Sequence, residues 1–222
     1  MRCMLRFLAL ATSLAALLMA AVPVPAPAHA APAEAAAWEI GPIVRGRSLS
    51  PGMPASARHE GGAAVFDIPS PSPREGHVHY VTRATGPLTG AERIVLRYRI
   101  DGEPGVRVLS QQDRRLAGEL TLYFQRRGDD WSARGRYGTY RWYAPAATMA
   151  PLTPGTHEVS VPLDAEWKSV HSATRTQAPE DFAASLANAS RVGFVLGSRG
   201  GRGHGVFATA PARFTILDFR VE

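Results

Sequence analysis

The stretch that decides the fold class is IVLRYRI, residues 94–100. Its apolar and charged side chains alternate strictly, with Leu96, Tyr98 and Ile100 in one phase and Arg97 and Arg99 in the other. The same alternation in ELTLYFQ, residues 119–125, separates Leu120, Leu122 and Phe124 from Glu119, Thr121, Tyr123 and Gln125. A period of two residues is typical of strands that bury one face in an antiparallel sheet. Both stretches therefore predict half-buried strands.

Short runs of this kind recur along the chain between glycine, proline and aspartate residues, for example AVFDI, HVHYV, TYRWY, HEVSVPL, RVGFVLG and ARFTILDFRV. One segment, APEDFAASLANAS at residues 178–190, predicts a helix instead. Pro179 and the acidic pair after it suit a first turn, and Phe182 and Leu186 are four residues apart. Many strands with one short helix predict an all-β fold, an antiparallel two-sheet β-sandwich of the jelly-roll type.

The last predicted strand changes phase within itself. Phe214 and Ile216 share one face, whereas Leu217, Phe219 and Val221 share the other. We therefore expect either a β-bulge near Ile216 and Leu217 or a strand covered on both faces.

The N-terminal part of the chain differs in composition from the rest. Arg2 and Arg6 precede an apolar run, and small residues end it at Ala30, so residues 1–30 are predicted to be a signal peptide. The run is shorter than the roughly 20 apolar residues that a membrane span needs. Residues 31–37 are expected to be a disordered leader and residues 38–222 a single domain. We expect an exported protein, periplasmic or secreted, that does not span a membrane.

The mature chain is expected to contain no thiol, because the single cysteine, Cys3, lies in the signal segment. Disulfides and cysteine-based catalysis are therefore excluded. Loss of the two N-terminal arginines lowers the formal charge from +6 to +4, and every basic residue except Lys168 is arginine. A modest positive charge suits anionic partners such as uronate or sulfated sugars and envelope polymers. Export argues against a nucleic-acid partner.

Two motifs invite a catalytic or binding interpretation. The run GSRGGRGHG, residues 197–205, lies between two predicted strands, so it favours a hairpin connection with positive φ angles over a nucleotide-binding loop. The alternative is an anion-facing loop with Arg199 and Arg202, and with His204 near a ligand. In GHVHYVTR, His77 and His79 would share a strand face, but no glutamate follows as in cupin-type metal sites. We expect two surface histidines there.

The richest candidate site is GDDWSARGRYGTYRWYAP, residues 128–145. If residues 137–143 form one strand, Tyr140 and Trp142 face the core and Tyr137, Arg141 and Tyr143 face solvent. Flat rings beside arginine and aspartate are suited to sugar recognition. The predicted ligand-binding residues are Asp129, Asp130, Trp131, Tyr137, Arg141, Tyr143, Arg202 and His204. The alternative is that the tyrosines cover an edge or fill the ends of the core.

The series THEVSVPLDAEWKSV, EDFAASLANA, RVGFVLG and FTILDFRVE resembles the galactose-binding-domain-like jelly rolls, a fold shared by many carbohydrate-binding modules. The resemblance covers roughly residues 90–222. It implies ligand binding at loops on one end of the sandwich or on a concave sheet face. It also implies a possible structural calcium, for which Glu39, Asp218 and Glu222 are the candidate ligands, and otherwise no cofactor.

Three hypotheses about function follow. The first is an exported, non-catalytic binding module that recognises a carbohydrate or an anionic envelope polymer. The second is a polysaccharide-acting, lyase-like enzyme using tyrosine, histidine and arginine, although no G-x-S-x-G or H-E-x-x-H signature is present. The third is a structural or protein-interaction component of the cell envelope, in which the tyrosine and arginine face binds a partner protein.

Overall fold

The computed structural model describes residues 37–72 and 78–222, which belong to one compact unit. The expected signal peptide and all of the expected leader except Ala37 lie outside the described residues. Within the described ranges, no helix combines the length and the apolar character that crossing a membrane requires. The domain start predicted at residue 38 stays a prediction.

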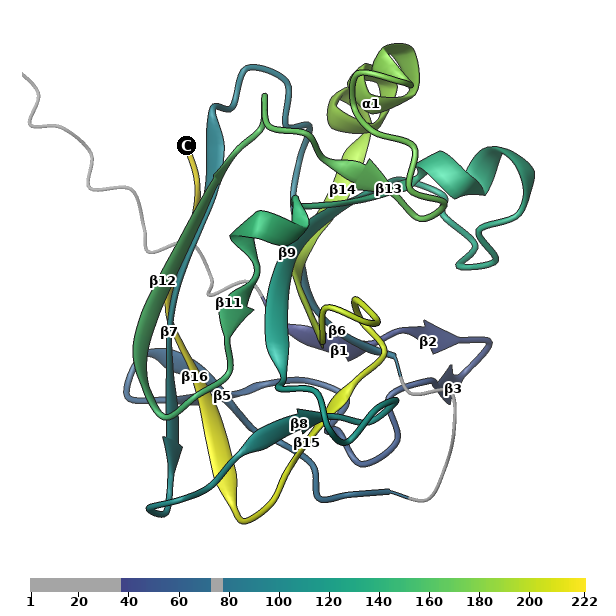
Figure 1. Ribbon diagram of the computed structural model, residues 1–222. Helices are drawn as coiled ribbons and strands as arrows, with labels where there is room; N and C mark the ends of the chain where they lie inside the picture. The colour runs from purple at the N-terminus through teal and green to yellow at the C-terminus, as the bar shows by residue number, and fades with distance from the viewer. Residues whose placement is uncertain (1–36, 73–77) are drawn as a thin grey trace, which may run out of the picture. The chain divides into compact units, whose positions relative to one another are not determined.

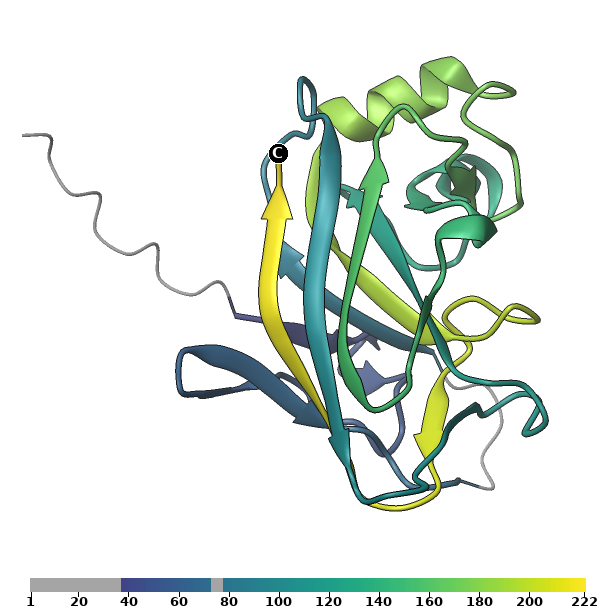
Figure 2. The same cartoon turned by 60° about the vertical axis from the view of Figure 1, so that its left-hand side comes forward.

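Two antiparallel sheets contain most of the strand residues of the described chain (Figures 1 and 2). In the larger sheet, the strand order is β1-β6-β14-β9-β10-β13, and β11 also pairs with β9. Its strands are β1 (Glu39–Gly41), β6 (His79–Ala84), β9 (Glu119–Arg126), β10 (Arg141–Tyr143), β11 (Ala150–Pro151), β13 (Lys168–Ser169) and β14 (Ala189–Gly197). The second sheet has the order β12-β7-β16-β5-β4. Its strands are β4 (Arg58–Glu60), β5 (Ala63–Asp67), β7 (Arg93–Gly102), β12 (Gly155–Pro162) and β16 (Ala212–Val221).

Two small ribbons and three helical segments complete the described elements. The ribbons pair β2 (Ile43–Val44) with β3 (Arg47–Ser48) and β8 (Val108–Ser110) with β15 (Val206–Ala208). The helical segments are α1 (Pro179–Ala187) and the 3-10 turns η1 (Gly135–Thr139) and η2 (Ala146–Thr148). This architecture confirms the predicted all-β, antiparallel fold with one short α-helix. The finer jelly-roll topology stays a prediction.

The main core contains residues from the inner faces of both sheets. Leu96, Tyr98 and Ile100 on β7 are buried, and Arg97 and Arg99 are exposed, as the alternation in β7 predicts. The rings of Tyr98 and Phe194, one from each sheet, both stack on Phe214 with centroid separations of 5.0 and 5.1 Å. Burial of this apolar surface is the main favourable contribution to folding.

Of the two arrangements expected for the last strand, the structure shows the β-bulge. The pairing of β16 with β7 shifts register between Ile216 and Asp218. The extra residue, Leu217, is 36% exposed, while Ile216 and Phe219 on either side remain in the core. One inserted residue therefore keeps apolar side chains of both phases on the buried face.

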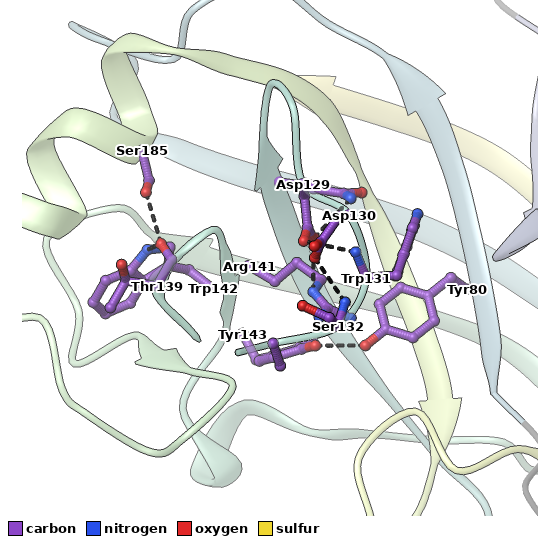
Figure 3. Close-up of polar contacts among 12 residues, drawn as sticks. Tyr80, Asp129, Asp130, Trp131, Ser132, Thr139, Arg141, Trp142, Tyr143 and Ser185 are labelled. Carbon is purple, nitrogen blue, oxygen red and sulfur yellow. Dashed lines mark hydrogen bonds and ion pairs between the residues drawn. The ribbon is translucent and has the colours of Figure 1, made fainter. Parts of the chain in front are cut away.

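Helix α1 covers one end of the sandwich and fixes the segment that precedes β10. Phe182 packs edge-on against the buried ring of Trp142 at 4.9 Å. The Ser185 hydroxyl donates to the Thr139 carbonyl oxygen at 2.9 Å, and Trp142 Nε1 donates to the same oxygen at 2.7 Å (Figure 3). Both contacts hold the end of η1 and therefore the start of β10.

The prediction that residues 137–143 form one strand is wrong. Tyr137 lies in η1, and only Arg141–Tyr143 is a strand. Gly135 has a φ of 53°, and Gly138 is buried where an added Cβ would lie 2.7 Å from the ring of His171. These two glycines permit a tight turn at this point, so the strand alternation does not extend back to Tyr137.

Candidate functional site

The face of the larger sheet that points away from the main core carries a second, smaller cluster of buried side chains. Tyr80 from β6, Tyr123 from β9, Tyr143 from β10 and Val195 from β14 form it. In the sheet register, Tyr143 lies opposite Tyr123, and Val195 lies opposite Tyr80. Three tyrosines from three strands are therefore brought together although they are far apart in the sequence.

The tyrosine hydroxyls lie in a nearly dry environment. Tyr80 Oη and Tyr143 Oη are 2.5 Å apart and share a hydrogen bond in which either can be the donor (Figure 3). Tyr80 and Tyr123 contact edge to face at 4.9 Å. Burial raises the pKa of Tyr80, Tyr123 and Tyr143, because it penalises the phenolate form. These hydroxyls therefore keep their protons at neutral pH.

The loop between β9 and η1 places a charged pair beside this cluster. The Asp129 side chain is fully buried, and its Oδ2 lies 2.8 Å from Nε of Arg141, whose side chain is 7% exposed. Asp129 Oδ2 also accepts from Gln125 Nε2 at 2.9 Å, and Oδ1 accepts from the Trp131 amide at 3.0 Å. Burial raises the pKa of Asp129, and the charge of Arg141 opposes that shift. The pair fixes the loop to β10.

The same loop contains unusual backbone conformations. Trp131 has a φ of 67° and Ala133 a φ of 56°, although neither is glycine. Non-glycine residues adopt this left-handed region at a cost, and such residues cluster at functional sites. The conformation directs the Trp131 ring onto Tyr80, edge to face at 5.0 Å, and beneath the guanidinium of Arg141 at 4.8 Å (Figure 3). The strain therefore accompanies a specific aromatic placement.

These elements enclose a pocket of about 440 Å³, which we call the Arg/Tyr pocket. Its lining residues are Val78, Tyr80, Trp131, Ala133, Arg141, Tyr143, Val170, Arg199, Gly200, Gly201, Arg202, Gly203 and His204. Within this described lining, the ionisable groups besides the tyrosines are three arginines and a histidine, and none is a carboxylate. The pocket therefore combines positive charge with aromatic walls.

The glycine-rich loop forms one wall of the Arg/Tyr pocket. It does not make the predicted hairpin, because β14 pairs with β9 and β6 whereas β15 pairs with β8. Positive φ angles are present, with 74° at Gly203 and 80° at Gly205. The Gly203 carbonyl accepts from the His79 amide at 3.0 Å, which ties the loop to β6. An added Cβ at Gly203 would approach the Tyr80 ring at 3.4 Å.

The two loop arginines differ in their partners. Arg199 Nε lies 3.1 Å from Glu119 Oε1, so part of its charge is balanced. The guanidinium of Arg202 stacks over the Tyr143 ring at 5.4 Å. Its Nη1 is buried and makes no hydrogen bond with any described residue. A buried guanidinium N–H without an acceptor is costly and is a candidate contact for an anion.

Five of the eight sequence-predicted site residues line the pocket: Trp131, Arg141, Tyr143, Arg202 and His204. Asp129 pairs with Arg141 but is not among the residues that line the pocket. Asp130 is exposed and accepts the Ser132 amide at 2.9 Å. Tyr137 is outside the lining and packs against Tyr140 at 5.1 Å. The expectation that Arg141 and Tyr143 face open solvent is wrong, since they are 6% and 5% exposed.

Sequence reasoning missed Tyr80, which closes the tyrosine cluster. The alternation in GHVHYVTR places Tyr80 on the face of β6 opposite to that of the core residue Val81, and this alternation is the signal that could have identified it. The expectation that His79 is a surface residue is also wrong. His79 is fully buried, and its Nδ1 accepts the Val206 amide at 3.1 Å. His77 lies outside the described residues.

The three candidate calcium ligands are each engaged by arginine. Glu39 pairs with Arg191 at 3.0 Å, while Asp218 and Glu222 both pair with Arg220. Across residues 37–72 and 78–222, no three histidine, cysteine, aspartate or glutamate side chains gather as metal ligands would.

A comparison of this chain with protein-family models, with curated proteins and with solved structures found no match. The resemblance to galactose-binding-domain-like jelly rolls therefore stays a prediction.

Proposed function

We propose that this is an exported protein that binds an acidic glycan, meaning a polymer containing uronate residues, in the Arg/Tyr pocket. Export is supported by the sequence of residues 1–30, which has the features of a signal peptide. The choice of an acidic ligand is supported by the charge of the pocket lining, and the choice of a sugar by its aromatic rings.

The observation that carries the proposal is the unpaired Nη1 of Arg202. Among the described residues, no carboxylate lies within ion-pair distance of this guanidinium, although Tyr143 holds it by stacking. A planar guanidinium forms paired hydrogen bonds with a carboxylate, and such bonds are about twice as strong as those between neutral groups. Arg202 Nη1, a buried donor without a hydrogen-bond partner, is therefore suited to a uronate carboxylate.

The rings of Trp131 and Tyr143 supply the second half of the recognition. Trp131 is partly exposed and lines the pocket, so its ring is available to a ligand. Aromatic side chains offer a large apolar surface at low conformational cost, which suits the C–H face of a pyranose. Arg141 is held by Asp129 and adds a fixed positive charge beside the ring. Stacking and charge together distinguish an acidic sugar from a neutral one.

The test is calorimetric titration of the purified protein with polygalacturonate, alginate and hyaluronate, and with dextran as a neutral polymer. We expect at least one acidic polymer to bind and dextran not to bind. Arg202→Gln is expected to weaken that binding by roughly 10-fold or more, since charged hydrogen bonds contribute about 1.5–3 kcal/mol. The matched control is Arg127→Gln, which removes the same charge from an exposed position outside the pocket. Equal losses in the two variants, or no binding at all, contradict the proposal.

A further inference from the structure

We infer that the Arg/Tyr pocket also cleaves the acidic glycan that it binds, by β-elimination at the uronate. This inference rests on the proposed function. It is motivated by the chemical groups that the pocket brings together. An elimination needs a cation at the uronate carboxylate, a base for the C5 proton, and a proton donor for the departing O4 oxygen.

The pocket lining contains a group suited to each requirement. Arg202, with its unused Nη1, is suited to the carboxylate, because it neutralises the charge that develops when the C5 proton leaves. His204 is exposed at the same pocket, and imidazole is the side chain most often used as a general base. The Tyr143 hydroxyl is the proton donor. Tyr143 lies on β10, and Arg202 and His204 lie in the glycine-rich loop. The two elements are in contact because Arg202 stacks on the Tyr143 ring.

The Tyr80–Tyr143 hydrogen bond favours the donor role for Tyr143. When Tyr80 donates to Tyr143 Oη, the proton of Tyr143 is free to point to another acceptor. Burial, together with the nearby Tyr80, raises the pKa of Tyr143 well above its usual value. The hydroxyl is therefore protonated at neutral pH, as a proton donor must be. After transfer, the positive charge of Arg141 stabilises the phenolate.

The elimination consumes no water and needs no cofactor. His204 removes the C5 proton, and the C5–H electron pair becomes the π bond between C4 and C5. The C4–O4 bond breaks with its electron pair on O4, and the Tyr143 proton completes the new hydroxyl. The proton on His204 then returns to Tyr143 through solvent. One product carries a C4=C5 double bond conjugated to its carboxylate, and the other ends in an ordinary sugar hydroxyl.

To test this inference, the protein is incubated with each acidic polymer that binds. The ultraviolet absorbance of the conjugated uronate and the masses of the products are measured. We expect unsaturated fragments that lack one water relative to hydrolysis products. Tyr143→Phe and His204→Gln are each expected to lower the rate by roughly 10²–10⁴-fold, the usual contribution of a positioned acid or base, while the Kd is unchanged. Because His204 is exposed, its variant keeps the fold.

Tyr137→Phe is the matched control, because it removes a tyrosine hydroxyl from the neighbouring turn outside the pocket. It should leave the rate unchanged. Binding of an acidic polymer without any unsaturated product overturns this inference and leaves the proposed function standing. If the rates of Tyr143→Phe and His204→Gln fall only in proportion to their loss of affinity, the inference is also overturned. The absence of both binding and product overturns the inference and the proposed function together.

Discussion

Asp129 and Arg141 form an ion pair of 2.8 Å in which the carboxylate is fully buried and the guanidinium nearly so. Burial lowers the pKa of Arg141, but its electrostatic interactions with Tyr143, Tyr80 and the Asp129 carboxylate outweigh that effect and raise it. The guanidinium thus stays charged in a nearly dry position. The pair connects the strained Trp131 loop to β10, so it positions two walls of the Arg/Tyr pocket at once.

We predict that Asp129→Asn destabilises the protein by about 3–5 kcal/mol, because it leaves the Arg141 charge buried without a counter-charge. Urea unfolding measures the change. Asp101→Asn is the control, since it breaks a half-exposed pair with Arg99 at a similar distance of 2.9 Å. That loss is expected to be about 0–1 kcal/mol. Equal losses at the two positions would contradict the structural role of the buried pair.

The buried tyrosines are expected to make the stability of the protein depend on pH in the alkaline range. The pKa values of Tyr80, Tyr98, Tyr123 and Tyr143 are all raised, in each case chiefly by burial. Their contribution to stability is therefore fully present below the unfolded value of roughly 10 and is lost as pH rises through the folded values.

The measurement is a spectroscopic titration of tyrosinate absorbance. At pH near 10, the folded protein should ionise fewer of its six tyrosines than the urea-unfolded chain does. Ionisation of the remainder should coincide with unfolding. Identical titration curves for the folded and unfolded chains would contradict the burial of these hydroxyls.

Gly193 lies where two strands of the larger sheet approach each other closely. It lies on β14 opposite Thr82 and Tyr123, and an added Cβ would meet the Val81 carbonyl oxygen at 2.0 Å. Gly193→Ala is therefore expected to destabilise the protein by about 1–3 kcal/mol or more through forced backbone movement. Gly86→Ala is the control, because its added Cβ meets open space. Thermal unfolding compares them, and a neutral Gly193 variant would contradict the strand pairing.

Much of the scaffold was predictable because it depends on local patterns. The alternation in IVLRYRI sets the buried face of β7, and the change of phase at Ile216 and Leu217 marks the bulge. Helix α1 follows from Pro179, its acidic first turn and the spacing of Phe182 and Leu186. Each of these features is decided by residues that are neighbours in the chain.

The site was only partly predictable, because it depends on contacts between distant segments. The composition of residues 128–145 indicates Trp131, Arg141 and Tyr143, but the burial of Arg141 and Tyr143 depends on the glycine-rich loop and Tyr80, which are distant in the sequence. The strand predicted from Tyr137 failed because Gly135 and Gly138 allow a turn that alternation cannot reveal. The Asp129–Arg141 pair had no local signal, since the loop conformation decides which carboxylate is buried.

The central claim is that the Arg/Tyr pocket binds a uronate through Arg202. The most direct measurement is a crystal structure of the Tyr143→Phe variant with an acidic oligosaccharide prepared from a polymer that binds. We predict a carboxylate within about 3.2 Å of the Arg202 guanidinium and a sugar ring against Trp131. An oligosaccharide bound on the outer face of the second sheet (β12-β7-β16-β5-β4), or one that makes no contact with Arg202, would contradict the account.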